Sequence, residues 1–148
     1  MSLLTTINAE LVTAMKAQQA TRLRGLRAIK AAILVANTDG SGKELDTERE
    51  TALLQKLVKQ RRESHDIYIA QNRPELAQTE QEEIDVIVEF LPKQLSREEV
   101  VAAVRQIVAE TGASSMKDMG KVMGLASKQL AGKTEGKLIS EVVKEVLA

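Results

Sequence analysis

Apolar residues recur every three or four positions along nearly the whole of this chain, and this spacing most limits the folds that it can adopt. A strand with one buried face needs an apolar residue at every second position, whereas a helix needs a repeat near 3.6. Ala, Leu, Glu, Lys and Gln, which dominate most segments, also favour helix. The sequence therefore predicts an all-α protein.

Turn residues interrupt the apolar pattern and divide the chain into seven expected helices. They are expected at about residues 3–17, 21–36, 47–71, 74–91, 96–112, 115–132 and 137–147. Three of them begin with a Ser or Thr that is followed three positions later by an acidic residue, which is the spacing of a capping box. These pairs are Thr47 with Glu50, Ser96 with Glu99, and Ser115 with Asp118.

The segment 91–95, which contains Pro92, is the expected boundary between two domains. Five of the eight glycines lie in the last third of the chain, so this third is expected to be a compact unit with tight turns. We predict an N-terminal helical domain of about four helices over residues 1–92, followed by a small C-terminal three-helix domain over residues 93–148.

The residue types that carry out most enzyme and metal chemistry are scarce. The chain has no cysteine, which excludes disulfides, thiolate zinc sites and cysteine nucleophiles. Its one histidine, His65, has Glu63 and Asp66 as neighbours on an expected helix, where adjacent side chains point in different directions. This arrangement gives neither a catalytic triad nor a metal site. We therefore predict no catalytic residue, no metal ligand and no cofactor.

Two other classes of site are also not expected. The Gly-Lys-Thr sequence at residues 132–134 is similar to part of a nucleotide-binding loop, but it lacks the earlier glycine and the preceding strand. No segment approaches the roughly 20 apolar residues of a membrane-spanning helix, and the N-terminus lacks the pattern of a signal peptide. We expect a cytoplasmic protein that does not bind a membrane.

Two glycines, Gly120 and Gly124, lie one helical turn apart within an expected helix. Each glycine inside a helix costs about 1 kcal/mol relative to alanine, so close approach by another group is the expected reason for them. On a helical wheel Lys117, Lys121 and Lys128 lie within about 40° of one another, with Gly124 beside them. Either this lysine surface admits a phosphate backbone, or the small residues let a neighbouring helix pack closely.

The opposite side of the same wheel is apolar, as a core-facing helix requires. It carries Met116, Met119, Val122, Met123, Ala126 and Leu130.

Charge is unevenly distributed along the chain although the net charge is zero. Every charged residue between Glu10 and Asp39 is basic, whereas acidic residues concentrate over 75–89. The acidic residues are expected to form a solvated face or a partner surface for the basic run. Tyr68 and Phe90 are the only aromatic residues, so bases have almost nothing to stack on and any nucleic-acid binding must read backbone and shape.

The chain resembles the YqeY-like proteins of the GatB/YqeY group over essentially its whole length. Five motifs in the family's order carry the resemblance: residues 14–17 (AMKA), 26–29 (LRAI), 58–64 (VKQRRES), 90–96 (FLPKQLS) and 117–124 (KDMGKVMG). One departure lies at Thr134 and Glu135, where the family more often has Ala-Asp, and Glu keeps the charge.

The resemblance implies an all-α protein whose C-terminal domain is similar to the tail of the B subunit of the glutamine-dependent aminoacyl-tRNA amidotransferase. That tail is associated with holding tRNA, and the catalytic domains of the enzyme have no counterpart here. We therefore expect a non-catalytic protein that binds tRNA or another structured RNA beside an amidotransferase or an aminoacyl-tRNA synthetase.

The expected RNA-binding residues lie on the glycine-bearing helix and the loop after it. Phosphates are expected to be contacted by Lys117, Lys121 and Lys128. Close approach of the RNA backbone is allowed by Gly120 and Gly124, and the site is extended by Lys133 and Lys137. One alternative is a protein-interaction module of the translation apparatus, which would use the basic run or the methionines of this helix. Another is participation in carbon–nitrogen ligase activity with glutamine as the amido-nitrogen donor.

Overall fold

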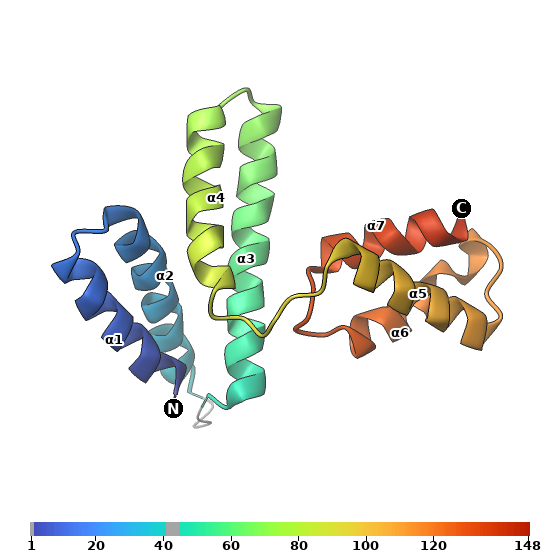
Figure 1. Cartoon of the computed structure of the whole chain (residues 1–148), viewed down its shortest axis with the longest axis horizontal. Helices are drawn as coiled ribbons and strands as arrows, with labels where there is room; N and C mark the ends of the chain where they lie inside the picture. The colour runs from blue at the N-terminus through green and yellow to red at the C-terminus, as the bar shows by residue number, and fades with distance from the viewer. Residues whose placement is uncertain (1, 41–44) are drawn as a thin grey trace. The chain divides into compact units, whose positions relative to one another are not determined.

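The computed structural model describes residues 2–40 and 45–148, and all the regular structure within those ranges is helical (Figure 1). This confirms the predicted all-α class. The helices are α1 (Leu3–Lys16), α2 (Ala20–Asn37), α3 (Thr47–Ala70), α4 (Pro74–Val88), α5 (Arg97–Thr111), α6 (Met119–Gln129) and α7 (Gly136–Leu147), with one 3-10 turn, η1 (Met116–Asp118), before α6.

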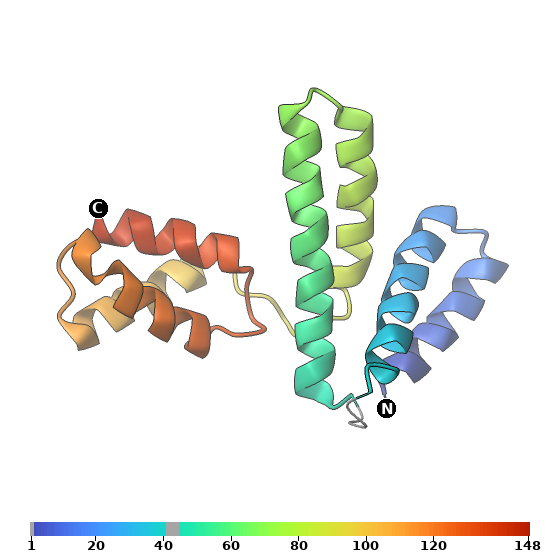
Figure 2. The same cartoon turned by 180° about the vertical axis from the view of Figure 1, so that it is seen from behind.

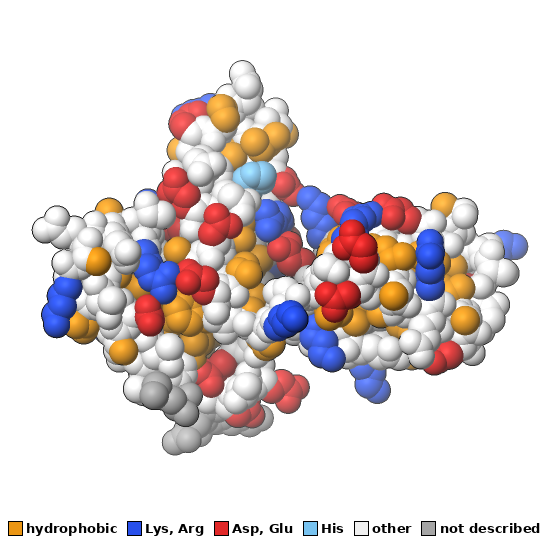
Figure 3. All heavy atoms as spheres, viewed as in Figure 1, with side chains coloured by type: hydrophobic (Ala, Val, Ile, Leu, Met, Phe, Trp, Pro, Cys, Tyr) orange, Lys and Arg blue, Asp and Glu red, His pale blue; other side chains and the backbone are white. Residues whose placement is uncertain are grey.

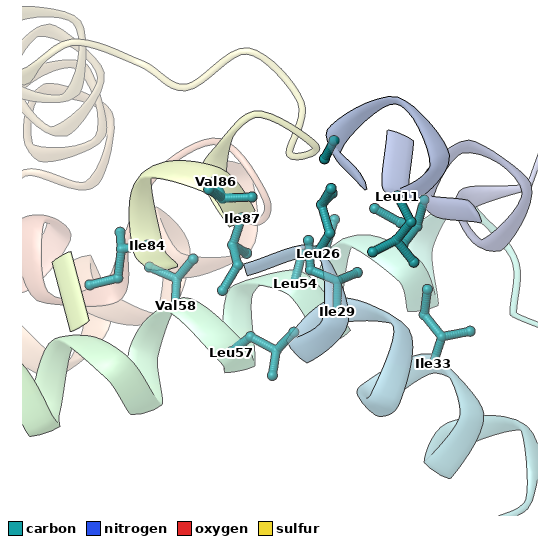
Figure 4. Close-up of a cluster of buried hydrophobic side chains, with 12 residues drawn as sticks. Leu11, Leu26, Ile29, Ile33, Leu54, Leu57, Val58, Ile84, Val86 and Ile87 are labelled. Atoms are coloured by element: carbon teal, nitrogen blue, oxygen red, sulfur yellow. The ribbon is translucent and has the colours of Figure 1, made fainter. Parts of the chain in front are cut away.

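The first four helices form one compact unit over residues 1–91. Helices α1 and α2 make one antiparallel hairpin, α3 and α4 make a second, and α2 packs against α4 (Figures 1 and 2). Apolar residues of all four helices meet in one core (Figure 4). Its fully buried side chains include Ile7, Leu26, Ile29, Ile33, Leu54, Ile84 and Ile87.

Gly25 allows α2 to pack closely against α4. A Cβ added at this glycine would lie 2.7 Å from the Cβ of Val86, which is closer than real Cβ atoms approach one another. The absence of a side chain at this position therefore sets how near the two hairpins come.

The last three helices form a second compact unit over residues 92–148. Helices α5, α6 and α7 each contact the other two and enclose a separate core. Its buried side chains are Val100, Val104, Ile107, Val122, Ala126, Leu130, Ile139, Val142, Val143 and Leu147. The division into two domains, residues 1–92 and 93–148, stays a prediction.

The caps of α5 match the sequence prediction. The Ser96 hydroxyl accepts a hydrogen bond from the Glu99 backbone N–H at 3.2 Å, and the Glu99 carboxylate accepts one from the Ser96 backbone N–H at 3.2 Å. Gly112 follows the helix with a left-handed φ of 70°, a conformation that costs glycine little.

The predicted capping box at Thr47 is wrong. The N-cap of α3 is Asp46, whose carboxylate accepts a hydrogen bond from the Arg49 backbone N–H at 2.8 Å. Glu50 instead accepts a hydrogen bond from the backbone N–H of Leu3 at 2.7 Å, at the start of α1. The Glu50 carboxylate, which the local spacing predicts to cap α3, is therefore used in a contact between distant parts of the chain.

The predicted capping box at Ser115 is also wrong. The Ser115 hydroxyl accepts a hydrogen bond from Lys117 at 3.3 Å and so caps the 3-10 turn. The Asp118 carboxylate accepts a hydrogen bond from the Ser114 backbone N–H at 3.0 Å instead of the Ser115 N–H that a capping box requires. The glycine-bearing helix accordingly begins at Met119.

Candidate nucleic-acid interface

Helix α6 has one face in the C-terminal core and one face open to solvent. Val122 and Ala126 are fully buried, and three further apolar residues of the helix pack partly buried against the same core. Lys121 and Lys128 are exposed on the other face. Met116, which was expected on the apolar side, lies in the 3-10 turn before α6 and is 47% exposed.

The two glycines of α6 lie on the open face. Both are exposed, and a Cβ built on either would meet no heavy atom of the described chain within 4 Å other than those of its chain neighbours and of the backbone of its own helix. The interpretation that these glycines let a neighbouring helix pack closely is therefore wrong for contacts within that part of the chain. Gly25, for which a Cβ would clash, has the packing role that the sequence offered to Gly120 and Gly124.

The lysines around this glycine face carry uncompensated charge. Lys117, Lys121, Lys128 and Lys133 are all exposed, and none forms an ion pair within residues 2–40 and 45–148. Lys137, at the start of α7, is exposed but has an interaction of its own. Residues 92–148 hold nine Lys and Arg against seven Asp and Glu, so this unit is net positive within a neutral chain. Such a surface attracts a polyanion.

The loop between α6 and α7 is fixed to the segment that precedes α5. The Leu95 backbone N–H donates to the Lys133 carbonyl at 2.8 Å, and the Gln94 Nε2 donates to the Gly132 carbonyl at 3.0 Å. Gly132 has a φ of 79°, and Thr134 is buried. The loop thus follows a helix and buries Thr134, as expected of a turn with a structural role. The side chain of Lys133 remains exposed.

The same hydrogen bonds place Lys93 beside this loop. The side chain of Lys93 is exposed and has no ion-pair partner in the described parts of the chain. Sequence reasoning assigned this lysine to a domain boundary and gave it no role. No local pattern shows the proximity, because the hydrogen bond from Gln94 to Gly132 joins residues 38 positions apart.

Two residues of the basic run in the N-terminal unit pair with carboxylates of α1, of α4 and of the residue that caps the end of α4. Arg22 pairs with Glu10 at 3.0 Å and with Glu89 at 2.6 Å, and its hydrogen bonds to these two carboxylates raise its pKa. Arg24 pairs with Glu82 at 2.8 Å. Figure 3 shows basic and acidic side chains intermixed over this unit. Glu82, Glu83 and Glu89 are therefore partners for Arg22 and Arg24, whereas Lys16, Arg27 and Lys30 form no ion pair within the described residues.

Arg61 of α3 joins the same charge network. Its Nε lies 3.4 Å from a carboxylate oxygen of Glu83, and the Nε of Arg24 lies 3.5 Å from the other. Glu80, one turn before Glu83, has its pKa raised by burial first and by the charge of Glu83 second. This network ties α2, α3 and α4 together, and the salt bridges leave its arginines less available to an external anion.

The remaining chemistry of the described residues is sparse. The His65 Nδ1 lies 3.1 Å from the carboxylate of Asp66 on the outer part of α3. Within residues 2–40 and 45–148, no three His, Asp or Glu side chains are grouped so as to hold a metal ion. None of the helices in those ranges has the length and apolar content that crossing a membrane requires.

Comparison with known proteins gives two findings. A family model described as "Yqey-like protein" matches residues 4–147. The chain is also similar to a protein of Meyerozyma guilliermondii named "Altered inheritance of mitochondria protein 41, mitochondrial", with 38% identity over 91 residues. That match covers 60% of this chain and 46% of the relative, so it spans less than half of the relative's length.

Proposed function

Since this chain belongs to the YqeY-like protein family, we propose that it is a non-catalytic RNA-binding protein whose ligand is tRNA or another structured RNA. The observation that carries the proposal is the open face of α6, where two glycines without a covering neighbour lie among unpaired lysines. A phosphate backbone fits such a surface, because the glycines permit close approach and the ammonium groups supply the attraction.

The proposed contacts follow the length of α6, whose 11 residues span about 16 Å. Lys121 and Lys128 contact phosphates along this helix, and Lys117 does so from the 3-10 turn before it. Lys133 and Lys137 extend the surface onto the following loop and the start of α7. Contacts of this kind position an RNA and carry little base information, so affinity is expected to depend strongly on salt and weakly on sequence.

The cellular setting belongs to the same proposal. The resemblance of the C-terminal helices to an amidotransferase tail favours a role beside an amidotransferase or an aminoacyl-tRNA synthetase, with those enzymes supplying the chemistry. We place this role in the cytoplasm. The name of the Meyerozyma guilliermondii relative assigns that protein to mitochondria.

Fluorescence anisotropy with labelled bulk tRNA tests the proposal. The unaltered protein is titrated at about 50 mM and about 200 mM salt, beside a variant carrying Lys121→Glu and Lys128→Glu. With five phosphate contacts the slope of log affinity against log salt is expected near −4.5, so the affinities at the two salt concentrations differ roughly 500-fold. The variant is expected to lose most of the binding at both concentrations.

A variant carrying Arg105→Glu and Lys144→Glu is the matched control. It makes the same change in net charge at exposed residues of α5 and α7. Equal loss of binding in both variants would show that only net charge matters and would refute the assignment to α6. No binding by the unaltered protein at low salt would refute the RNA-binding function.

The protein-interaction alternative has weaker support in the structure. Met119 and Met123 pack against the C-terminal core, so most of the methionine face of α6 is used in folding. Val35, at 71% exposure near the end of α2, is the most open of the large apolar residues described. Recovery of a protein partner that survives nuclease treatment would favour this alternative. Glutamine-dependent amide transfer by this chain alone would favour the carbon–nitrogen ligase.

A further inference from the structure

The segment over residues 92–95 lies against the α6–α7 loop as a fixed part of the C-terminal unit. Gln94 clamps it, because one side-chain nitrogen donates to the Pro92 carbonyl at 2.7 Å and to the Gly132 carbonyl at 3.0 Å. The Leu95 backbone N–H adds a bond of 2.8 Å to the Lys133 carbonyl. Residues on both sides of Lys93 are thus held in place.

Lys93 therefore belongs to a segment that is hydrogen-bonded to the loop that carries Lys133. Both side chains are exposed, and neither has an ion-pair partner in the parts of the chain that the structure describes. Two exposed lysines without ion-pair partners, on segments that are bonded to each other, add positive charge to one region of the surface, and such a region attracts an anion.

We propose that Lys93 is a further RNA-contacting residue, and that the chain entering the C-terminal unit forms one edge of the binding surface. This inference rests on the proposed function. It extends the surface from α6 across the loop to a segment that precedes α5 in the sequence. Gln94 has a positioning role, because its hydrogen bonds hold Lys93 at the loop.

The salt dependence of tRNA binding tests the role of Lys93. Loss of one phosphate contact in Lys93→Gln is expected to make the slope of log affinity against log salt less steep by about 0.9. Between 50 mM and 200 mM salt, the ratio of affinities is then expected to shrink by roughly 3- to 4-fold. Lys144→Gln removes an exposed charge on α7 and is the matched control, with an unchanged slope expected.

Gln94→Ala tests the positioning role. It removes no charge but frees the segment, so affinity is expected to fall while helix content and thermal unfolding change little. Hydrogen exchange at the Leu95 N–H is expected to slow when tRNA binds to the unaltered protein, and to slow less in Lys93→Gln at the same saturation.

The outcomes separate this inference from the proposed function. If Lys93→Gln and Lys144→Gln both keep the slope of the unaltered protein, Lys93 is not part of the surface, although a loss in the Lys121 and Lys128 variant would still support RNA binding. If the unaltered protein binds no tRNA at low salt, both the function and this inference are wrong.

Discussion

Replacing Gly120 and Gly124 by alanine is expected to stabilise the protein and weaken its binding to RNA. The two effects have opposite signs because the glycines are unfavourable for helix α6 yet leave its outer face open. A purely structural role for these glycines predicts a loss of stability instead.

The expected stabilisation follows from the position of each glycine. Gly124 lies in the interior of α6, where alanine is favoured by about 0.8–1.0 kcal/mol. Gly120 is the second residue of the helix, so its replacement contributes less, on the order of 0.5 kcal/mol. Neither has a positive φ, and an added methyl group at either meets no atom of the described chain within 4 Å outside its chain neighbours and its own helix backbone. Together they are expected to raise the free energy of unfolding by about 1.5 kcal/mol, which is roughly 3–6 °C in Tm.

The two effects are measured on the same samples. Thermal unfolding followed by circular dichroism gives the stability, and tRNA anisotropy at fixed salt gives the affinity. Two methyl groups on the glycine face keep the RNA backbone farther from α6, so affinity is expected to fall several-fold. Gln129→Ala is the control, because Gln129 lies roughly 140° around the same helix from Gly124 and leaves the glycine face unchanged.

Two results would refute parts of this reasoning. Lower stability in the double alanine variant would mean that something packs on these glycines after all. Higher stability with unchanged affinity would mean that the RNA does not approach the helix closely, and that the lysines act without the glycines.

Two further predictions concern the N-terminal unit, and urea unfolding measures both. Gly25→Ala is expected to lower the free energy of unfolding by about 1–2 kcal/mol, because the new methyl group meets Val86 at 2.7 Å. The gain in helix propensity does not offset the cost of this clash. Equal or greater stability of the variant would show that α2 and α4 can move apart without cost. Glu80→Gln is expected to raise stability slightly at pH 7 and to match the unaltered protein below pH 4.5. The fold raises the Glu80 pKa above its ordinary 4.5, so the ionised form destabilises the folded state at neutral pH and the protonated form does not. A gain that persisted at low pH would contradict this cause.

The helices and the fold class followed from the sequence because they depend on local spacing. The pairs Ser96–Glu99 and Thr47–Glu50 have the same spacing, yet only the first forms a capping box. At the second pair, Asp46 caps the helix, and the Glu50 carboxylate accepts a hydrogen bond from the backbone N–H of Leu3, which lies 47 positions away. Spacing reports which contacts are possible, and the tertiary fold selects among them.

The candidate site was predictable to a similar extent. The pattern of lysines and glycines on one face of α6 was readable from the sequence, but it did not show whether another helix covers that face. The lack of any neighbour at Gly120 and Gly124 answers this for the described chain. Lys93 was missed because its proximity to Lys133 depends on hydrogen bonds between distant segments.

The hydrogen bonds of Gln94 also affect where a fragment of the C-terminal unit should begin. A fragment that begins at Ser96 keeps α5, α6 and α7 and the cap of α5, and looks complete by its helices. It lacks both hydrogen bonds that hold Gly132 and Lys133, so its α6–α7 loop is released. A fragment that begins at Gln94 retains both of these hydrogen bonds, and one that begins at Pro92 also retains the carbonyl that accepts the second bond from the Gln94 side chain.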